Sequence, residues 1–203
     1  MLIETHCHTK EHSPCSEITA FNLIRGAMAK GLQGVVLTDH HYLWSDTDLN
    51  ELRWELKCPE EFVLLSGQEV TTRDFDDVLV YGASEAFPFG TPLTEIRRQA
   101  PEAAIVWAHP FRGIKRPSID LLFSALLDAV EIFNRNHRMV QNRYAFRLWQ
   151  EWGFVATAGT DVHDELIGIF PSWFNGQIHT LNDFVQAIRN GRCRPHMKRF
   201  KAV

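Results

Sequence analysis

Two short stretches decide the fold of this chain: MLIETHCH at residues 1–8 and AGTDVH at residues 158–163. In each stretch a short apolar run leads directly into residue types that bind metals, His-x-His in the first and Asp-x-His in the second. Short apolar runs bounded by polar residues are typical of buried strands. The two stretches therefore predict two strands whose ends carry functional side chains.

The composition is that of an ordinary globular protein, with 203 residues of which 45% are hydrophobic and 23% charged. This length suits one domain, and we expect residues 1–203 to form it. A net charge of -4 gives no reason to expect an extended nucleic-acid surface. The sequence shows no signal-peptide pattern, no membrane-spanning run and no CxxC pairing among its four cysteines. We therefore expect a cytoplasmic protein with free thiols and no membrane partner.

Strand patterns alternate with helix patterns along the chain. The strand candidates are short and apolar along most of their length, as in strands that are covered on both faces. They lie at residues 2–5, 34–38, 62–65, 78–81, 104–108, 129–133 and 154–158. Helix patterns lie at residues 18–30, 47–56, 93–99, 118–127, 138–152 and 181–190. This alternation predicts an α/β fold and a barrel-like arrangement of one domain.

Two details of this arrangement follow from local spacing. The gap between Glu69 and Val78 is too short for a helical crossover, so we expect antiparallel strands there and an irregular barrel. The stretch PSWFNG, at residues 171–176, is expected to form a rim or lid at the mouth of the barrel.

Residue types that bind metals recur where the predicted strands end. They are His6, His8, Asp39, His40, His41, Glu69, His109, Asp161 and His163, and Asp77 opens the fourth strand. In a β/α barrel the carboxyl ends of the strands meet at one mouth, where active sites lie. The sequence therefore predicts that these side chains share one site.

The spacing of the residues supports a metal cluster. Positions i and i+2 of an extended chain point the same way, so His6 and His8 reach one ion while Cys7 points away. Asp161 and His163 are expected to repeat this geometry. Imidazole and carboxylate together suit zinc, manganese or iron. Because the candidates exceed what one tetrahedral ion binds, we expect two or three ions.

Each motif alone has an ordinary explanation. A single His-x-His is more often surface or core than metal ligand, and His109-Pro110 could simply end a strand. Glu69 could pair with Arg73 at the surface. Their joint occurrence at separate strand ends favours metal binding, because such groups buried together without a cation would leave charges and polar atoms unsatisfied.

In combination, the motifs resemble those of the PHP family, named for polymerase and histidinol phosphatase. The matching motifs are HCHT at 6–9, TDH at 38–40, GQE at 67–69, AHP at 108–110 and GTDVH at 159–163. The stretch LNDFVQAIRNGRCRP, at 181–195, also looks like the end of the small stand-alone phosphoesterases of this family. The resemblance implies a distorted (β/α)7 barrel with a cluster of two or three divalent Mn, Fe or Zn ions at its C-terminal mouth. It also implies hydrolysis of a phosphate ester by metal-activated water.

The resemblance also implies a set of metal ligands, with Glu69 as the bridging carboxylate. The set is His6, His8, His40, Glu69, His109, Asp161 and His163. Two positions depart from the family pattern. A further ligand expected shortly after HCHT has only His12 and Cys15 as candidates, and Asp77 stands where the family often has His. A carboxylate there can still bind, favouring manganese or iron over zinc, and a two-metal site is an alternative to three.

Phosphate-ester hydrolysis needs further groups around the metals. His41 and His137 are the candidates for the general acid that protonates the leaving oxygen. Arg112 and Arg135 are the candidates for binding the phosphate, because arginine binds its oxygens in pairs. Lys10 and Lys115 are weaker choices. We expect a small phosphorylated metabolite or a nucleotide as substrate, with monoester and diester both compatible.

Two other functions compete with this interpretation. A non-catalytic PHP-like domain would keep metal for stability or bind a partner, and the altered ligand region and Asp77 favour it. A metal-dependent amidohydrolase uses related chemistry on related barrels. The TDH and GTDVH motifs fit it less well than they fit the phosphoesterase.

Overall fold

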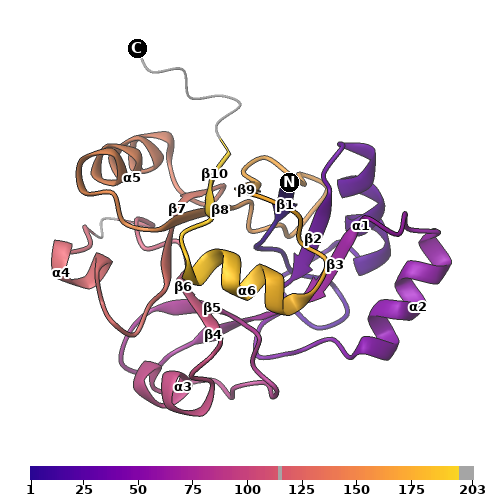
Figure 1. Cartoon of the computed structure of the whole chain (residues 1–203), viewed down its shortest axis with the longest axis horizontal. Coiled ribbons are helices and arrows are strands. Elements are labelled where there is room, and N and C mark those ends of the chain that lie inside the picture. The colour runs from indigo at the N-terminus through magenta and orange to yellow at the C-terminus, as the bar shows by residue number, and fades with distance from the viewer. Residues whose placement is uncertain (114–115, 197–203) are drawn as a thin grey trace.

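The computed structural model describes residues 1–113 and 116–196, in which strands and helices alternate (Figure 1). The strands are β1 (Leu2–Glu4), β2 (Gly34–Leu37), β3 (Val63–Ser66), β4 (Gln68–Thr71), β5 (Asp77–Tyr81), β6 (Ala104–Trp107), β7 (Ala129–Asn134), β8 (Ala156–Gly159), β9 (Ser172–Phe174) and β10 (Cys193–Pro195). The helices are α1 (Ala20–Ala29), α2 (Asp46–Leu56), α3 (Leu93–Gln99), α4 (Ile119–Leu122), α5 (Met139–Trp152) and α6 (Leu181–Arg189). The α/β prediction is confirmed.

The strands form two five-stranded sheets. The first has the order β10-β9-β1-β2-β3 and the second the order β4-β5-β6-β7-β8. The pairs β1–β2, β2–β3, β6–β7 and β7–β8 are parallel. Strand β5 runs antiparallel to β4, as the short gap before Val78 predicted, and also antiparallel to β6, which was not predicted.

The chain passes from one sheet to the other at Gly67, between the end of β3 and the start of β4. A Cβ atom at Gly67 would lie 2.5 Å from Cδ1 of Tyr81, so glycine fits this crossing and larger residues do not. A second connection between the sheets is an isolated bridge that joins Cys7, after β1, to Val162, after β8. Within the described parts of the chain the sheets form no closed barrel, so the (β/α)7 detail is not confirmed.

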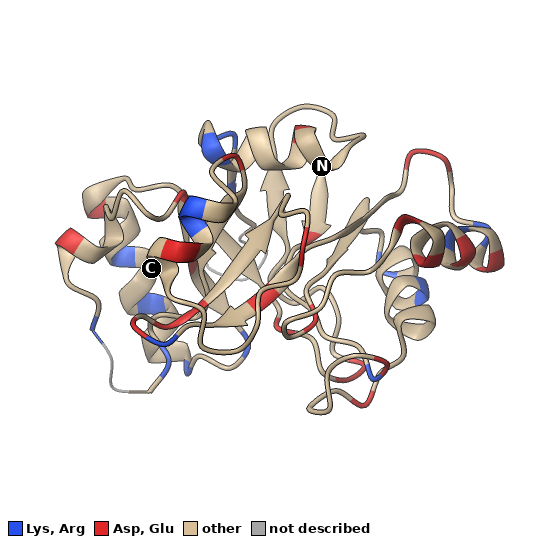
Figure 2. Ribbon diagram, turned by 90° about the horizontal axis from the view of Figure 1, so that it is seen from below, with Lys and Arg blue, Asp and Glu red and all other residues tan. Residues whose placement is uncertain are grey.

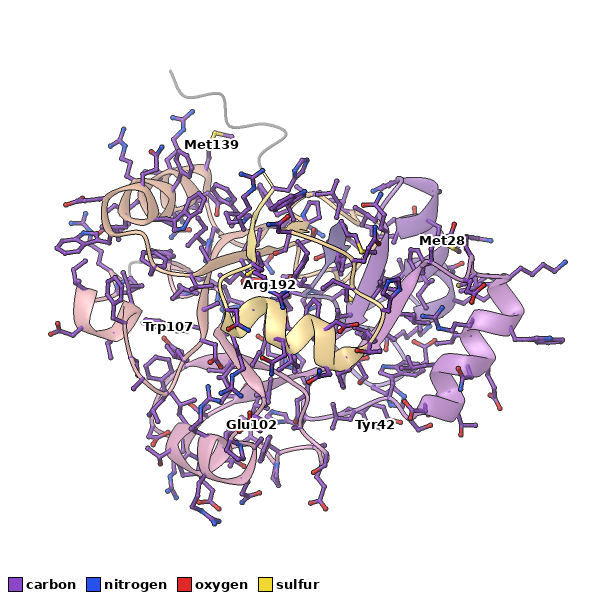
Figure 3. All side chains as sticks on the ribbon, viewed as in Figure 1. Met28, Tyr42, Glu102, Trp107, Met139 and Arg192 are labelled. Carbon is purple, nitrogen blue, oxygen red and sulfur yellow. The ribbon has the colours of Figure 1, made fainter. Side chains whose placement is uncertain are left out.

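Apolar side chains fill the space between the two sheets and beneath the helices (Figure 3). Phe184 and Ile188 of α6 pack into the cluster that contains Ile3 and Val106. A Cβ atom at Gly82, which follows β5, would lie 2.9 Å from Val185 of α6. Helix α6 therefore closes the end of the strands opposite to the one where Asp77 and the end of β6 lie.

Several parts of the fold differ from the sequence prediction, which did not include strands β4 and β10. Strand β9 forms within the PSWFNG stretch and pairs with β1, so this stretch belongs to a sheet and the prediction of a lid was wrong. Helix α4 covers only Ile119–Leu122, much less than the predicted 118–127.

Charged residues of both signs lie over the surface, with acidic residues concentrated on α2 (Figure 2). No helix in the described residues is both long and apolar enough to cross a membrane.

Candidate metal centre

The extension of β1 places two histidines side by side. Nε2 of His6 lies 3.2 Å from Nε2 of His8, and both rings are fully buried. Cys7 points the other way and its thiol donates to the carbonyl of Val36 at 3.2 Å. The predicted i, i+2 geometry is therefore present at His6 and His8.

Glu69 of β4 lies at the centre of the cluster. Its Oε2 lies 3.1 Å from Nε2 of His8, 3.2 Å from Nδ1 of His40 and 3.5 Å from Nε2 of His6. Its Oε1 lies 2.9 Å from Nε2 of His109. One buried carboxylate thus touches four imidazoles, which is the arrangement expected of a group shared between ions.

Asp161 and His163 reach the same cluster from the loop after β8. Oδ1 of Asp161 lies 3.2 Å from Nε2 of His8 and 3.4 Å from Nε2 of His6. Asp161 has φ +57°, so the extended geometry predicted at residues 161–163 is wrong. His41 and His109 also have positive φ, 56° and 31°. Such backbone strain in non-glycine residues concentrates at functional sites.

The donor atoms form overlapping groups. Three triads have ligand atoms that lie within 4.8 Å of one another. They are His6, His8 and Asp161; His6, Glu69 and His109; and His8, His40 and His163. Every ligand that the motifs predicted, apart from Asp77, belongs to at least one triad. Asp77 lies at the edge of the cluster, with Oδ2 3.8 Å from Nε2 of His109.

The antiparallel direction of β5 explains how Asp77 reaches this end of the sheet. Asp77 opens β5 beside the end of β6, where the amide of Ala108 donates to its carbonyl at 3.0 Å. Its side chain is also 3.5 Å from Nη2 of Arg112.

A buried acid that sequence reasoning missed lies behind the cluster. Glu131, in the middle of β7, is fully buried and its Oε1 lies 3.0 Å from Nδ1 of His6. Its Oε2 accepts from the amide of His109 at 2.8 Å and from Nδ2 of Asn134 at 2.9 Å. Carboxylates that bind the outer nitrogen of a metal-binding histidine fix its tautomer and orientation. The signal in the sequence was a lone acid inside the apolar run AVEIF.

Gly159 makes this contact sterically feasible. A Cβ atom there would lie 2.2 Å from Oε1 of Glu131 and 2.4 Å from Cβ of His6. The glycine of the GTDVH motif is therefore required by the close approach of β8 to both side chains.

Asp39 of the TDH motif has a structural role. Oδ1 accepts from the amide of Thr9 at 2.7 Å and from the hydroxyl of Ser13 at 2.6 Å. Oδ2 accepts from the hydroxyl of Thr9 at 2.8 Å and from Nε1 of Trp44 at 2.8 Å. Asp39 thereby joins the loop after β1 to the loop after β2.

Burial and the neighbouring charges shift the pKa values of the side chains in this cluster. Burial by itself would raise the pKa of Glu69, but His6 and the hydrogen bond with His109 hold this pKa well below its usual range. Burial opposes charge on His6, yet Asp161 and Glu131 raise the pKa of His6 well above its usual value. Burial lowers the pKa of His40 and of His163. A nearby positive charge therefore stabilises the carboxylates of Glu69 and Asp161, and either a proton or a divalent cation can provide this charge.

The donor set fits divalent metal better than protons. His6 turns its outer nitrogen to Glu131, which leaves Nε2 facing the Nε2 of His8 and the two carboxylates. Two imidazole nitrogens that face each other at 3.2 Å repel each other when both carry a proton, whereas both can bind a cation through their lone pairs. The His, Glu and Asp clusters thus indicate divalent metal binding.

A cavity of about 460 Å³ opens over the cluster. Its lining residues are Cys15, His40, Glu69, Asp77, His109, Arg112, Arg135, Asn136, Asp161 and His163. Both arginines predicted to bind phosphate line this cavity, but Arg135 makes a two-point ion pair with Asp164. Cys15, one of the two candidates for an additional ligand, lines it as well.

Several other candidates lie away from the cavity lining. Nδ1 of His41 lies 3.0 Å from the carbonyl of Phe87, and Nδ1 of His137 lies 3.0 Å from Oδ1 of Asn142. His12 stacks on Tyr42 with ring centroids 3.5 Å apart. Lys10 is exposed, and Lys115 lies outside the described residues. Neither general-acid candidate is therefore placed at the cavity by these contacts, and that role stays a prediction.

Comparison with known proteins gives one relative by sequence. No family model matches the chain. An uncharacterised protein of Methanocaldococcus jannaschii is 28% identical over 149 residues, which cover 68% of this chain and 84% of that protein.

Solved structures with the same fold cover most of the chain. PsfC from Pseudomonas syringae has a TM-score of 0.70 at 15% identity, over 99% of this chain and 91% of that one. A candidate metal-dependent phosphoesterase from Bifidobacterium adolescentis has a TM-score of 0.59 at 16% identity, over 80% and 88%. These likenesses confirm the fold-level resemblance to PHP-like proteins that the motifs predicted.

Two further structures widen the range of chemistry found on this fold. The lesion-specific endonuclease Q of Pyrococcus furiosus has a TM-score of 0.59 at 17% identity, over 94% of this chain and 56% of that one. An amidohydrolase from Chromobacterium violaceum has a TM-score of 0.60 at 14% identity, over 79% and 87%. The fold likeness alone therefore leaves the substrate open.

Proposed function

We propose that the chain is a metal-dependent phosphoesterase that hydrolyses a phosphate ester of a small metabolite or nucleotide. The observation that carries the proposal is the buried Glu69 cluster opening into a cavity that also holds the guanidinium of Arg112. Two or three divalent ions of Mn, Fe or Zn, when bound, would activate water and offset phosphate charge. The neighbour described as a candidate phosphoesterase supports this class.

In this proposal, some residues bind the metal ions and others bind the phosphate. His6, His8, His40, Glu69, His109, Asp161 and His163 hold the ions, and Asp77 adds a carboxylate at the edge. Arg112 is half exposed at the cavity and binds a phosphate oxygen, because its charge faces the substrate space. We further propose that residues 1–203 act as one domain, with the two sheets as halves of a distorted (β/α)7 barrel.

The experiment starts from protein that has been stripped with a chelator and reloaded with Mn²⁺, Fe²⁺ or Zn²⁺. Substrates are an aryl phosphate monoester, an aryl phosphodiester, nucleotides and short oligonucleotides, the last because endonuclease Q shares the fold. We expect turnover of at least one of these, lost on chelation and in Asp161→Asn. Asp120→Asn, which changes an exposed carboxylate on α4, is the matched control and should remain active.

The alternatives predict different results in the same assay. Metal bound at stoichiometry without turnover of any phosphate ester would support a non-catalytic metal-binding domain. Hydrolysis of amides without hydrolysis of phosphate esters would support an amidohydrolase, the activity named for another neighbour.

A further inference from the structure

The loop after β7 holds the loop after β8 through two consecutive side chains. Arg135 donates from Nη1 to Oδ1 and from Nη2 to Oδ2 of Asp164, both at 2.7 Å. Asn136 donates from Nδ2 to Oδ2 of Asp161 at 2.6 Å. The segment from Asp161 to Asp164 is therefore held by side-chain hydrogen bonds at both of its ends.

The hydrogen bond from Asn136 orients the carboxylate of Asp161, a candidate metal ligand. Asn136 occupies Oδ2 of Asp161, which leaves Oδ1 directed at the rings of His6 and His8. The left-handed backbone of Asp161 is unfavourable for a residue with a Cβ, so it persists where neighbouring groups hold it. His163 lies in the same segment, and its Nδ1 is 2.9 Å from the carbonyl of Asp161.

The same geometry leaves Arg135 poorly available to a substrate. Its guanidinium already donates two hydrogen bonds to the carboxylate of Asp164. Oδ1 of Asp164 also accepts from the amide of Leu166 at 2.8 Å. Arg112 differs, because its contact with Asp77 is a single one at 3.5 Å and its side chain is 51% exposed.

We propose that Arg135 and Asn136 are positioning residues for the metal centre, and that Arg135 acts through Asp164 instead of binding the phosphate. The inference rests on the proposed metal site and changes the role that the sequence suggested for Arg135. Ion pairs near the surface contribute little to global stability, so the effect of breaking this one should appear at the metal. Groups that orient metal ligands typically change metal affinity by about 10- to 100-fold.

The test measures Mn²⁺ affinity by calorimetry, without substrate, in Arg135→Gln, Asp164→Asn and the double variant. We expect each single change to weaken the affinity about 10-fold, near the lower end of the range for such contacts. The double variant should be no weaker than either single one, because both changes break the same contact. At saturating Mn²⁺ the KM for an aryl phosphate should stay unchanged. Arg98→Gln, which breaks an exposed ion pair with Glu95 on α3, is the matched control.

Conservative variants separate positioning from phosphate binding. Arg135→Lys keeps the charge and loses the fork, so it should leave Mn²⁺ affinity low. Unchanged affinity in Arg135→Gln together with a raised KM would overturn the proposal. Additive losses in the double variant would also overturn it. Failure of the wild type to bind any of Mn²⁺, Fe²⁺ and Zn²⁺ would overturn this proposal and the proposed function together, whereas metal binding without turnover would overturn only the phosphoesterase.

Discussion

Nδ1 of His6 lies 3.0 Å from Oε1 of Glu131, and both side chains are fully buried. When Nδ1 of His6 donates to this carboxylate oxygen, the lone pair of a neutral His6 is on Nε2, which faces Glu69 and Asp161 and is free to bind a cation. We predict that Glu131→Gln weakens metal affinity by about 10- to 100-fold, because the amide no longer fixes the tautomer.

Metal titration of the variant checks this prediction. Glu102→Gln is the matched control, since it makes the same chemical change at an exposed site. Equal affinity in Glu131→Gln and the wild type would mean that packing alone orients His6.

Gly159→Ala should disrupt both the fold and the metal centre. The added Cβ would meet Oε1 of Glu131 at 2.2 Å and Cβ of His6 at 2.4 Å. Overpacking of this kind typically costs about 1–3 kcal/mol of unfolding free energy, and it displaces His6. Denaturant unfolding and metal titration measure the two effects.

Gly176→Ala offers the comparison, because Gly176 has φ +96° and no atom lies within 4 Å of the Cβ position. That variant should lose about 1–2 kcal/mol from backbone strain and keep its metal affinity. If Gly159→Ala behaved the same way, the steric argument at β8 would fail.

The cation-free protein should lose stability as the pH rises. Burial opposes charge on His8, but hydrogen bonds with Asp161 and Glu69 raise its pKa from 6.5 to about 9. A pKa that is higher in the folded state adds stability that is complete below the unfolded value and is lost as pH rises through the folded value. The melting temperature in chelator should therefore fall between pH 6.5 and 9.

The apparent affinity for metal should rise with pH, in the opposite direction to the stability of the cation-free protein. A bound ion needs a neutral imidazole, so binding below about pH 9 releases the proton of His8, and apparent affinity rises with pH. Calorimetry in two buffers of different ionisation enthalpy measures the released protons. His179→Asn, at an exposed histidine, should leave the profile unchanged. A melting temperature in chelator that stayed constant over this range would contradict the assigned charge state.

Arg112→Gln should impair substrate binding and spare the metals. A hydrogen bond from a charged group to phosphate is worth about 1.5–3 kcal/mol, which corresponds to a rise in KM of roughly 10- to 100-fold. Steady-state kinetics with an aryl phosphate and a Mn²⁺ titration measure the two quantities separately. A lowered Mn²⁺ affinity with unchanged KM would assign Arg112 to Asp77 and the metal centre instead.

The candidate site could be predicted from the sequence because its candidate ligands lie at strand ends, and strand ends are visible as breaks in hydrophobicity. His6 and His8 are the clearest case, since the two-residue period of extended chain fixes their common direction. The antiparallel direction of β5, which brings Asp77 to this end of the sheet, followed from the short gap that precedes it.

What the sequence did not reveal depends on contacts between distant segments. Glu131 looks like an interruption of an apolar strand until His6, 125 residues away, is placed beside it. Arg135 looks like a free cation until Asp164 is placed against it. Strand β9 has only three residues and forms by pairing with β1, so its local sequence carries little signal.

The crossing at Gly67 has a consequence for the behaviour of the whole molecule. Glu69 lies on β4 of the second sheet, directly after this crossing, while His6 and His8 follow β1 of the first sheet and His109 follows β6 of the second. An ion held by these groups would connect residues from both sheets. Metal binding should therefore slow amide exchange in the strands on both sides of the contact between the two sheets, and hydrogen exchange with and without metal measures this effect.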